Sequence, residues 1–318
     1  MKRFQSGFVF GMVAIVGVFG AVGGAVGQDK PTMEIGKSKR PPPDFSDRKV
    51  TFNTPDGITI EADFYPVKVE VPKRTPAVVL IHMYPKNRSS WKEFVPDLRA
   101  KGIAVLAYDI RGTGGSTKPE SMNLTEQYKA RSTALFQLAT LDAVAAFDFL
   151  RQQEYIDTSR VALIGASVGC TISLDFANQT SDAKAIVCLS PGVNYFDLDS
   201  LATIKTAASY LPILLISPEA EYDAVEKLAE VGGARVETEK YPGGKEYHGT
   251  NMLSSPFGDK VRERILAFLV KNLEIKDEKK SDDDKKKKVT SDDDSKGEKD
   301  KKKKSKKSGK KKSNESTK

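Results

Sequence analysis

The sequence predicts an α/β domain built on an open, mostly parallel sheet of about eight strands, with helices on both faces. Three observations favour it. Two strand-like segments near the start flank a tight-turn sequence, later strand-like segments are short and continuously apolar, and helix-like segments separate them. Continuous Val, Ile and Leu runs are typical of parallel strands covered on both faces. Alternation of such runs with helices indicates βα units.

The domain starts with a predicted hairpin, because residues 49–54 and 58–65 flank Pro55-Asp56-Gly57 and Asp-Gly favours a tight antiparallel turn. The apolar strands that follow are predicted at 77–82, 103–108, 161–165, 185–189, 213–217 and, last, 235–241. The helices are predicted at 90–100, 135–152, 168–178, 223–230 and 259–272. The segment 191–211, between the strands predicted at 185–189 and 213–217, is short.

The chain begins with a segment that resembles a targeting sequence. Lys2 and Arg3 precede an uncharged stretch over residues 8–26, which is followed by Gly27. A basic start, an apolar run and small closing residues are typical of a secretory signal peptide. We therefore predict a signal peptide at 1–27 and an exported protein, periplasmic or secreted. The apolar run is nearly long enough to span a bilayer, so an uncleaved membrane anchor is the alternative.

Two further segments flank the predicted domain, which covers residues 48–273. Residues 28–47 contain three consecutive prolines and predict a stiff linker. Residues 274–318 predict a disordered tail, because Val289 is the only apolar residue after Ile275 and such a segment cannot form a core.

The tail carries the net charge. From Lys276 onward it holds 19 lysines against 11 acidic residues, which leaves 32 basic and 32 acidic residues in the rest of the chain. A neutral body lacks the basic surplus that nucleic acid requires, so no nucleic-acid partner is predicted. The tail itself predicts either a solubilising extension or contact with an anionic surface or polymer.

The strongest chemical signal is Gly165-Ala166-Ser167-Val168-Gly169, which joins an apolar strand to an apolar helix. A serine with glycine two positions before and two after it forms a tight turn that exposes its Oγ. The glycines are needed because the turn is strained and the helix passes close to the strand. The segment therefore predicts Ser167 as a nucleophile.

A serine hydroxyl needs an adjacent base near neutral pH, and the chain has only two histidines, His82 and His248. His248 lies in a loop between the last strand and the last helix. Because the carboxyl ends of parallel strands meet at one edge of a sheet, His248 can reach Ser167. His82 precedes the nucleophile and ends the first parallel strand, so we interpret it as structural. His248 is the predicted general base.

These segments resemble the α/β-hydrolase superfamily, nearest to its dienelactone-hydrolase-like and serine-aminopeptidase-like esterase branches. Residues 81–84 are similar to the family's oxyanion segment, residues 108–116 to its Asp-x-Arg-Gly loop, and residues 165–169 to its nucleophile turn. Met83 stands where the family usually has glycine, and Cys170 stands where another glycine is frequent. The resemblance covers roughly residues 48–273. Many members of the family insert a helical lid where this chain has the short segment 191–211, so the resemblance implies a short lid over the site.

The resemblance implies an oxyanion hole formed by the backbone N–H groups of Val168 and Tyr84, with Met83 as the alternative to Tyr84. Such donors stabilise the charge that appears in a tetrahedral intermediate, and losing one typically slows catalysis about 100- to 1000-fold.

The resemblance also implies an acid that follows the strand at 213–217. Counted from that strand, the family's aspartate falls on Glu221, which lies 27 residues before His248. A glutamate can orient the imidazole as an aspartate does. Asp223 and then Glu219 are the alternatives, and Asp223 also suits a helix N-cap.

Other side chains leave two interpretations open. Cys170 and Cys188 lie in apolar segments and are predicted to be buried free thiols, with a single disulfide as the alternative. Four side chains in the short 191–211 segment either line an acyl or alcohol pocket or only pack a helix: Tyr195, Phe196, Leu198 and Tyr210. The sequence contains no pattern for a metal or a nucleotide cofactor, so neither is predicted.

Together these features predict an exported serine hydrolase that cleaves ester bonds of a small-molecule substrate through an acyl-enzyme. A serine peptidase acting on short peptides is the first alternative. The second is a non-catalytic binding protein on a hydrolase scaffold, against which the intact Ser167 and His248 argue.

Overall fold

The computed structural model describes residues 43–70 and 73–276. The predicted signal peptide, most of the predicted linker and the tail after Lys276 therefore lie outside the described residues. The strands are β1 (Arg48–Asn53), β2 (Thr59–Tyr65), β3 (Thr75–Ile81), β4 (Ala104–Tyr108), β5 (Ile156–Ala166), β6 (Ala185–Leu189), β7 (Asn194–Tyr195), β8 (Leu198–Asp199), β9 (Ile213–Pro218) and β10 (Val236–Tyr241).

Helices and short 3₁₀ turns connect these strands. The α-helices are α1 (Val95–Ala100), α2 (Leu124–Lys129), α3 (Thr133–Gln137), α4 (Thr140–Arg151), α5 (Val168–Gln179), α6 (Ser200–Ala207), α7 (Tyr222–Gly232) and α8 (Gly258–Asn272). The 3₁₀ turns are η1 (Arg88–Trp91), η2 (Glu120–Met122), η3 (Glu219–Glu221), η4 (Gly233–Arg235), η5 (Lys245–Tyr247) and η6 (Gly249–Ser254).

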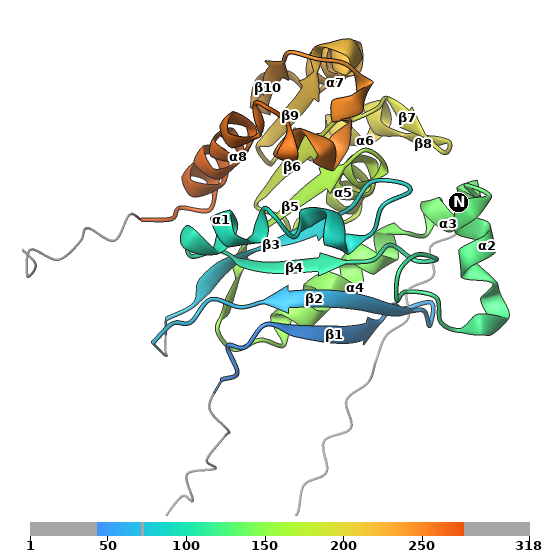
Figure 1. Ribbon diagram of the computed structural model, residues 1–318, viewed down its shortest axis with the longest axis vertical. Helices are drawn as coiled ribbons and strands as arrows, with labels where there is room; N and C mark the ends of the chain where they lie inside the picture. Colours follow the sequence, from blue (N-terminus) through green and yellow to red (C-terminus); the bar gives the residue numbers. More distant parts are fainter. Residues whose placement is uncertain (1–42, 71–72, 277–318) are drawn as a thin grey trace, which may run out of the picture. The chain divides into compact units, whose positions relative to one another are not determined.

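The predicted α/β fold is confirmed. Eight strands form one sheet in the order β1-β2-β4-β3-β5-β6-β9-β10, and β7 and β8 pair separately (Figure 1). β2 is antiparallel to both β1 and β4. The other strands of this sheet are parallel to one another: β4, β3, β5, β6, β9 and β10. All carboxyl ends of the parallel strands therefore meet at one edge, which is where ligands bind in open α/β sheets.

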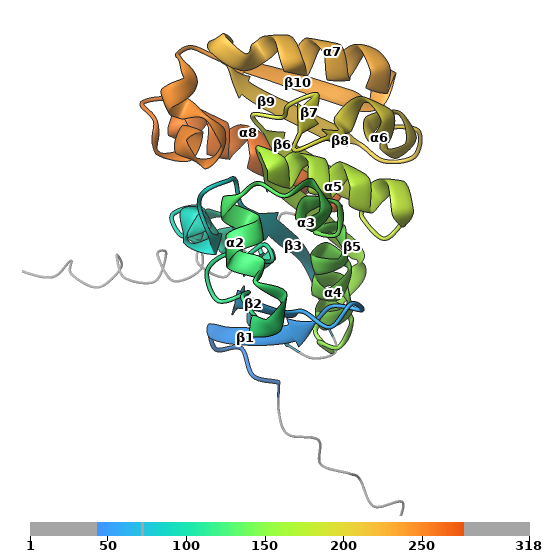
Figure 2. The same cartoon turned by 90° about the vertical axis from the view of Figure 1, so that its right-hand side faces the viewer.

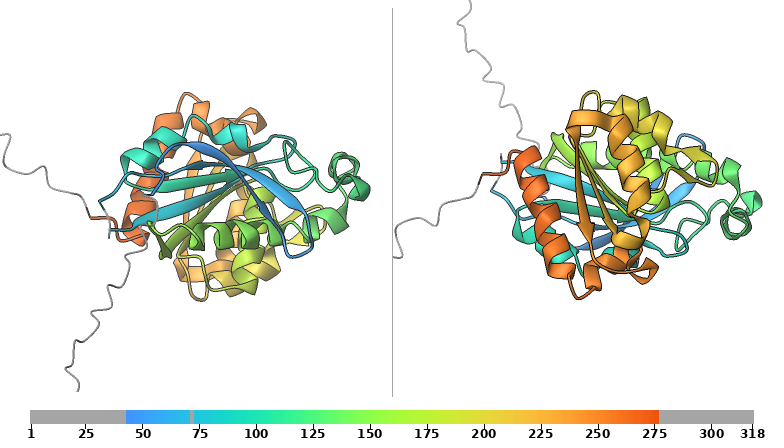
Figure 3. Two further views of the ribbon diagram at one scale, coloured as in Figure 1. Left: turned by 90° about the horizontal axis from the view of Figure 1, so that it is seen from below. Right: turned by 90° about the horizontal axis from the view of Figure 1, so that it is seen from above.

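Two cores lie on opposite faces of the sheet. Along β3, the side chains of Val79 and Ile81 enter one core and those of Val78 and Leu80 enter the other, so both faces of the strand are buried. Helices α4, α5, α6 and α7 cover the first face, and α1 and α8 cover the second (Figure 3). This double cover explains why the parallel strands are apolar without alternation.

The structure divides two of the predicted helices and adds α2 and α6, which none of the predicted helix ranges covers. The helix predicted at 90–100 is divided into η1 and α1, and α1 has Pro96 in its first turn, where a missing N–H costs no helical hydrogen bond. The helix predicted at 135–152 is divided into α3 and α4. α3 belongs with α2 to an excursion over residues 117–139 beyond the carboxyl edge of the sheet (Figures 1 and 2). Helices of five or six residues are too short for the periodicity that reveals a helix in a sequence.

Candidate active site

Ser167 lies at the turn between β5 and α5. Its backbone has φ 53° and ψ −120°, a conformation that is strained for any residue with a Cβ. A Cβ added to Gly165 would collide with the backbone of Gly169, and one added to Gly169 would collide with Ile81 at the end of β3. Both glycines are therefore needed for the close approach of α5 to the sheet. Ser167 lies at the carboxyl edge and is 5% exposed.

His248 and Glu221 come together at the same edge. His248 lies between η5 and η6, and its Nδ1 is 2.9 Å from both Oε1 and Oε2 of Glu221. Burial acts to raise the pKa of Glu221, but the hydrogen bond and the charge of His248 outweigh it, so the pKa lies below its ordinary value. Glu221 is therefore a carboxylate at neutral pH, and it can hold Nδ1 of His248 as the protonated nitrogen.

Of the three acids that the sequence proposed, the structure brings only Glu221 to His248. Asp223 is exposed in the first turn of α7, and Glu219 is exposed at the start of η3. Within the described ranges neither forms a hydrogen bond with His248.

The loop that carries His248 is held by two residues that the sequence analysis did not link to it. Ser190 follows β6, and its Oγ accepts a hydrogen bond of 2.9 Å from the backbone N–H of Gly249. Met83 is buried, and its Sδ accepts a 3.7 Å contact from the hydroxyl of Thr250. The side chain at the unusual position 83 thus packs against the histidine loop, a contact that a glycine there could not make.

Ser167 and His248 share this edge, but in the described part of the chain no hydrogen bond joins their side chains. Burial raises the pKa of the Tyr195 phenol, and the nearby Ser167 hydroxyl acts against that rise. The Tyr195 hydroxyl donates to the backbone oxygen of Ser190 at 3.1 Å. Catalytic hydrogen bonds are often long in unliganded sites and shorten when substrate binds.

The turn after β3 is set by the buried ring of His82. Nε2 of His82 accepts from the N–H of Ile110 at 3.0 Å, so the neutral ring carries its proton on Nδ1, which is 2.9 Å from the backbone oxygen of Met83. The N–H of Lys86 also donates to that oxygen, at 2.9 Å. In a trans peptide the C=O and the next N–H point in opposite directions, so these bonds fix the direction of the Tyr84 N–H.

The second predicted oxyanion donor is available for a different reason. Val168 is the first residue of α5, and the first N–H groups of a helix have no acceptor within that helix. The structure thus leaves a backbone donor next to Ser167.

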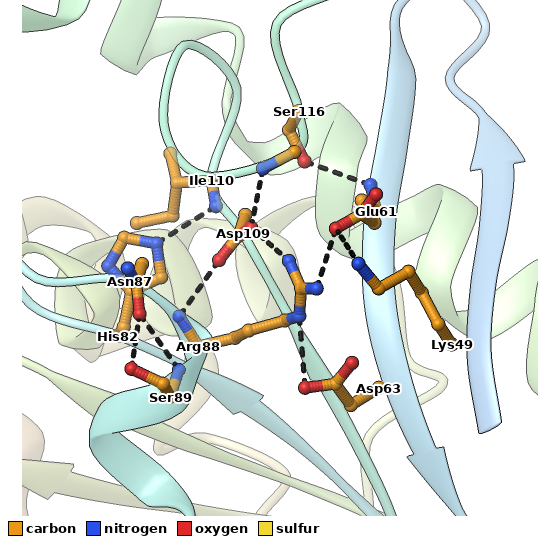
Figure 4. Close-up of polar contacts among 11 residues, drawn as sticks. Lys49, Glu61, Asp63, His82, Asn87, Arg88, Ser89, Asp109, Ile110 and Ser116 are labelled. Carbon is orange, nitrogen blue, oxygen red and sulfur yellow. Dashed lines mark hydrogen bonds and ion pairs between the residues drawn. The ribbon is translucent and has the colours of Figure 1, made fainter.

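An ion-pair cluster holds the turn from the other side (Figure 4). The backbone N–H of Arg88 donates to Oδ1 of Asp109 at 2.9 Å, and its guanidinium contacts Asp109, Glu61 at 2.6 Å and Asp63 at 3.1 Å. Oδ2 of Asp109 also accepts from the N–H of Gly115 at 2.8 Å. The predicted Asp-x-Arg-Gly loop and β2 therefore brace the residues that follow the turn after β3, the predicted oxyanion segment.

The buried state of His82 predicts a pH-dependent stability. Burial holds its pKa at about 4, against an ordinary value of 6.5. Between these values the unfolded chain takes up a proton that the folded protein does not. The free energy of unfolding should therefore fall as the pH drops through this window, by about 3 kcal/mol in all, and should gain nothing from this group above pH 6.5.

His82→Gln tests this expectation, because an amide can donate to Met83 and accept from Ile110 but does not titrate. Urea unfolding of the native protein and of His82→Gln at pH 4 to 7 should show the native protein losing stability faster as the pH falls. Parallel pH profiles for the two proteins would contradict a neutral buried His82.

Two segments cover the site beside Tyr84. The rings of Tyr84 and Tyr128 lie 5.0 Å apart, and those of Phe136 and Phe196 stack at 4.3 Å. Thr133 on α3 donates to Asp197 in the β7–β8 turn at 2.9 Å. The short cover predicted from residues 191–211 is thus joined by α2 and α3 (Figure 2). The sequence did not indicate this contact.

The other open side-chain questions have separate answers. Tyr210 donates to the backbone oxygen of Thr180 at 2.8 Å, at the end of α5, so it packs a helix. Cys170 and Cys188 are both buried and free. Across residues 43–70 and 73–276, no three His, Cys, Asp or Glu side chains are grouped to hold a metal ion.

Comparisons with known proteins agree with this geometry. The family model described as alpha/beta hydrolase fold matches residues 76–219, a range that contains Ser167 and ends before Glu221 and His248. An uncharacterized protein of Mycobacterium tuberculosis is 27% identical over 186 residues, which make up 58% of this chain and 57% of that protein. The chain thus matches little more than half the length of this curated relative.

Two further likenesses involve named hydrolases. Epoxide hydrolase A of Mycobacterium tuberculosis is 38% identical over 71 residues, 22% of this chain and 21% of that protein. A Pyrococcus furiosus esterase of known structure superposes with a TM-score of 0.58 at 16% identity, over 72% of this chain and 92% of that chain. At this identity the superposition establishes a shared fold and nothing more about activity.

Proposed function

The chain belongs to the α/β-hydrolase superfamily, and on that premise we propose that it is a serine hydrolase that cleaves ester bonds of a small-molecule substrate. One observation carries the proposal. The Glu221 carboxylate accepts a hydrogen bond of 2.9 Å from Nδ1 of His248. This contact lies at the edge of the sheet where Ser167 occupies a strained turn. That arrangement has the order and the parts of a Ser-His-acid triad.

The proposed reaction has two halves. Nε2 of His248 takes the proton from Ser167 as its Oγ attacks the ester carbonyl, and the N–H groups of Val168 and Tyr84 stabilise the resulting oxyanion. His248 then gives the proton to the departing alcohol. Water, activated by the same nitrogen, releases the acyl group and regenerates Ser167. Glu221 holds the imidazole in the required tautomer throughout.

The cavity of about 330 Å³ next to Glu221 favours an ester substrate over a peptide that is bound by its free amino end. Its lining includes Lys227 and Lys245 as well as Glu221 and Asp223, so it is not the acidic pocket that a peptide amine would need. Cleavage of short peptides is the second candidate function.

Epoxide opening, the reaction named for one relative, does not suit a serine at this position. Attack of a serine oxygen on an epoxide forms an ether, which water does not cleave as it cleaves an ester, so the enzyme would be consumed in one turnover. An acyl-serine, in contrast, is hydrolysed in the second half of the reaction.

The proposal is tested with the purified full chain, a fluorophosphonate probe and three substrate sets: p-nitrophenyl esters of different acyl length, aminoacyl-aminomethylcoumarin amides, and styrene oxide. We expect covalent labelling of one serine and turnover of esters above that of the other two sets. Amide turnover above ester turnover would make the protein a peptidase. No labelling and no turnover would leave the non-catalytic binding role.

We also propose that the protein is exported, on the pattern of residues 1–27, which lie outside the described residues. Cleavage after Gly27 would leave Gln28 as the first residue. N-terminal sequencing of the protein recovered from the exported fraction should therefore read from Gln28, whereas an intact Met1 would support the membrane anchor.

A further inference from the structure

A second cavity, of about 540 Å³, lies at the opposite edge of the sheet from Ser167. Its walls come from the connection between β2 and β3, the end of α1 and the end of α8, which lie together at the left of Figure 1, while α2, α3 and β7 lie at the right. The seven residues of β3 separate the two edges by about 20 Å, at roughly 3.3 Å per residue.

The lining of this cavity has one sign of charge. Seven of its 15 residues are lysine or arginine, and none is acidic. Arg99 pairs with Asp47 at 3.1 Å, and Arg160 pairs with Asp157 at 2.7 Å. Those two cations are therefore neutralised by acids outside the lining.

A third cation of the lining, Lys73, also interacts with another residue. The remaining four cations have no such neutralisation: Lys68, Arg74, Lys101 and Lys276. Within the described ranges none of the four forms an ion pair. They come from three segments that are far apart in the sequence, so only the fold brings them together. A cleft lined by a single sign of charge concentrates its field and attracts ions of the opposite sign.

We propose that this cavity binds a linear polyanion that carries a phosphate or a carboxylate on each repeat. The four cations surround a cavity large enough for several charged groups, so they match separated negative charges better than a single ion. Lys276 lines the cavity and is also the first residue of the lysine-rich tail.

The position of the cavity determines how a bound polymer affects the proposed catalytic site. A polymer bound at the amino edge leaves the carboxyl edge, with Ser167 and His248, open to small substrates. The enzyme would then be held on an anionic matrix without loss of turnover. This inference does not depend on the proposed esterase activity, because it rests on charges at the other edge of the sheet.

Lysine acetylation of the full chain, mapped by mass spectrometry, tests the cavity separately from the tail. Long-chain inorganic polyphosphate and polyglutamate serve as the two probes, and orthophosphate as the single-ion comparison. We expect either polymer at low salt to slow acetylation of Lys68 and Lys101 several-fold, and added salt to reverse the effect. The exposed Lys92, Lys205 and Lys260, which lie outside this cavity, should not change.

Charge-removing variants give the matched comparison. Lys68→Gln/Arg74→Gln/Lys101→Gln should weaken polymer binding about a hundredfold, since each basic residue near an anionic surface contributes about fivefold. Lys92→Gln/Lys205→Gln/Lys260→Gln should leave the binding unchanged. Both triple variants should keep the native far-UV circular dichroism and the native ester turnover, because within the described ranges none of the six residues forms a hydrogen bond or an ion pair with Ser167, His248 or Glu221.

Three outcomes would overturn the proposal. Equal protection by orthophosphate would make the cavity a site for a single ion. Protection of tail lysines alone would place the polymer on the tail. The third is that Lys68 and Lys101 are already protected without a polymer and become reactive in Asp282→Asn/Asp283→Asn/Asp284→Asn. The occupant would then be the acidic segment of this same chain.

Discussion

Ser167→Ala is expected to lower kcat for a short-chain p-nitrophenyl ester by about 10⁶-fold, and to abolish fluorophosphonate labelling, without loss of the fold. The hydroxyl is the proposed nucleophile, and no neighbouring group can replace its Oγ at the end of β5. The residual rate should come from the oxyanion donors and from binding, which act without the nucleophile. Equal labelling of the native protein and of Ser167→Ala would move the nucleophile elsewhere.

Ser167→Gly is the matched variant, because it removes the same hydroxyl and also relieves the backbone. Position 167 has φ 53° and ψ −120°, which costs a residue with a Cβ of order 1–3 kcal/mol and a glycine much less. We therefore expect Ser167→Gly to be as inactive as Ser167→Ala but more stable by about 1 kcal/mol in urea unfolding. Equal stability of the two variants would show that the turn is not strained.

Glu221→Gln is expected to lower kcat by about 10⁴-fold while the circular dichroism and the thermal midpoint stay close to native. An amide can still contact Nδ1 of His248, but it no longer favours the tautomer that leaves Nε2 free to accept the proton of Ser167. It also no longer stabilises the imidazolium that forms during attack. KM should change little, because Glu221 acts through His248.

Asp223→Asn is the control for this prediction, since Asp223 lies two residues away and is exposed. Its kcat should stay within about threefold of native, as expected for a surface carboxylate without a partner in the site. The reverse ranking of the two variants would assign the acid to Asp223, the alternative that the sequence left open.

The fold could be predicted in large part because its signals are local. Continuous apolar runs marked the parallel strands, and the strand order along the chain placed Ser167 and His248 at one edge. The glycines around Ser167 were informative for the same reason, since a strained turn constrains the residues next to it. The catalytic roles of Ser167, His248 and Glu221 remain predictions, for which the variants above are the test.

Several features of the site could not be predicted, because they depend on contacts between distant segments. Glu221 and Asp223 are two acids in one turn, and only the packing of the histidine loop brings Glu221 to Nδ1 of His248. Ser190 had no signal of its own, since a serine after a strand is common. The contact of Met83 with Thr250 joins residues 167 positions apart.

The sequence by itself determined the class of fold, the strained serine turn and the small set of groups able to act as base and acid, because these depend on local pattern and chain order. The tertiary structure alone decided which acid meets His248, how His82 holds the turn after β3, and where basic side chains of the neutral body gather. Net charge is a sum that ignores position, whereas the basic cavity exists because folding brings Lys68, Arg74 and Lys101 of the neutral body to one edge of the sheet.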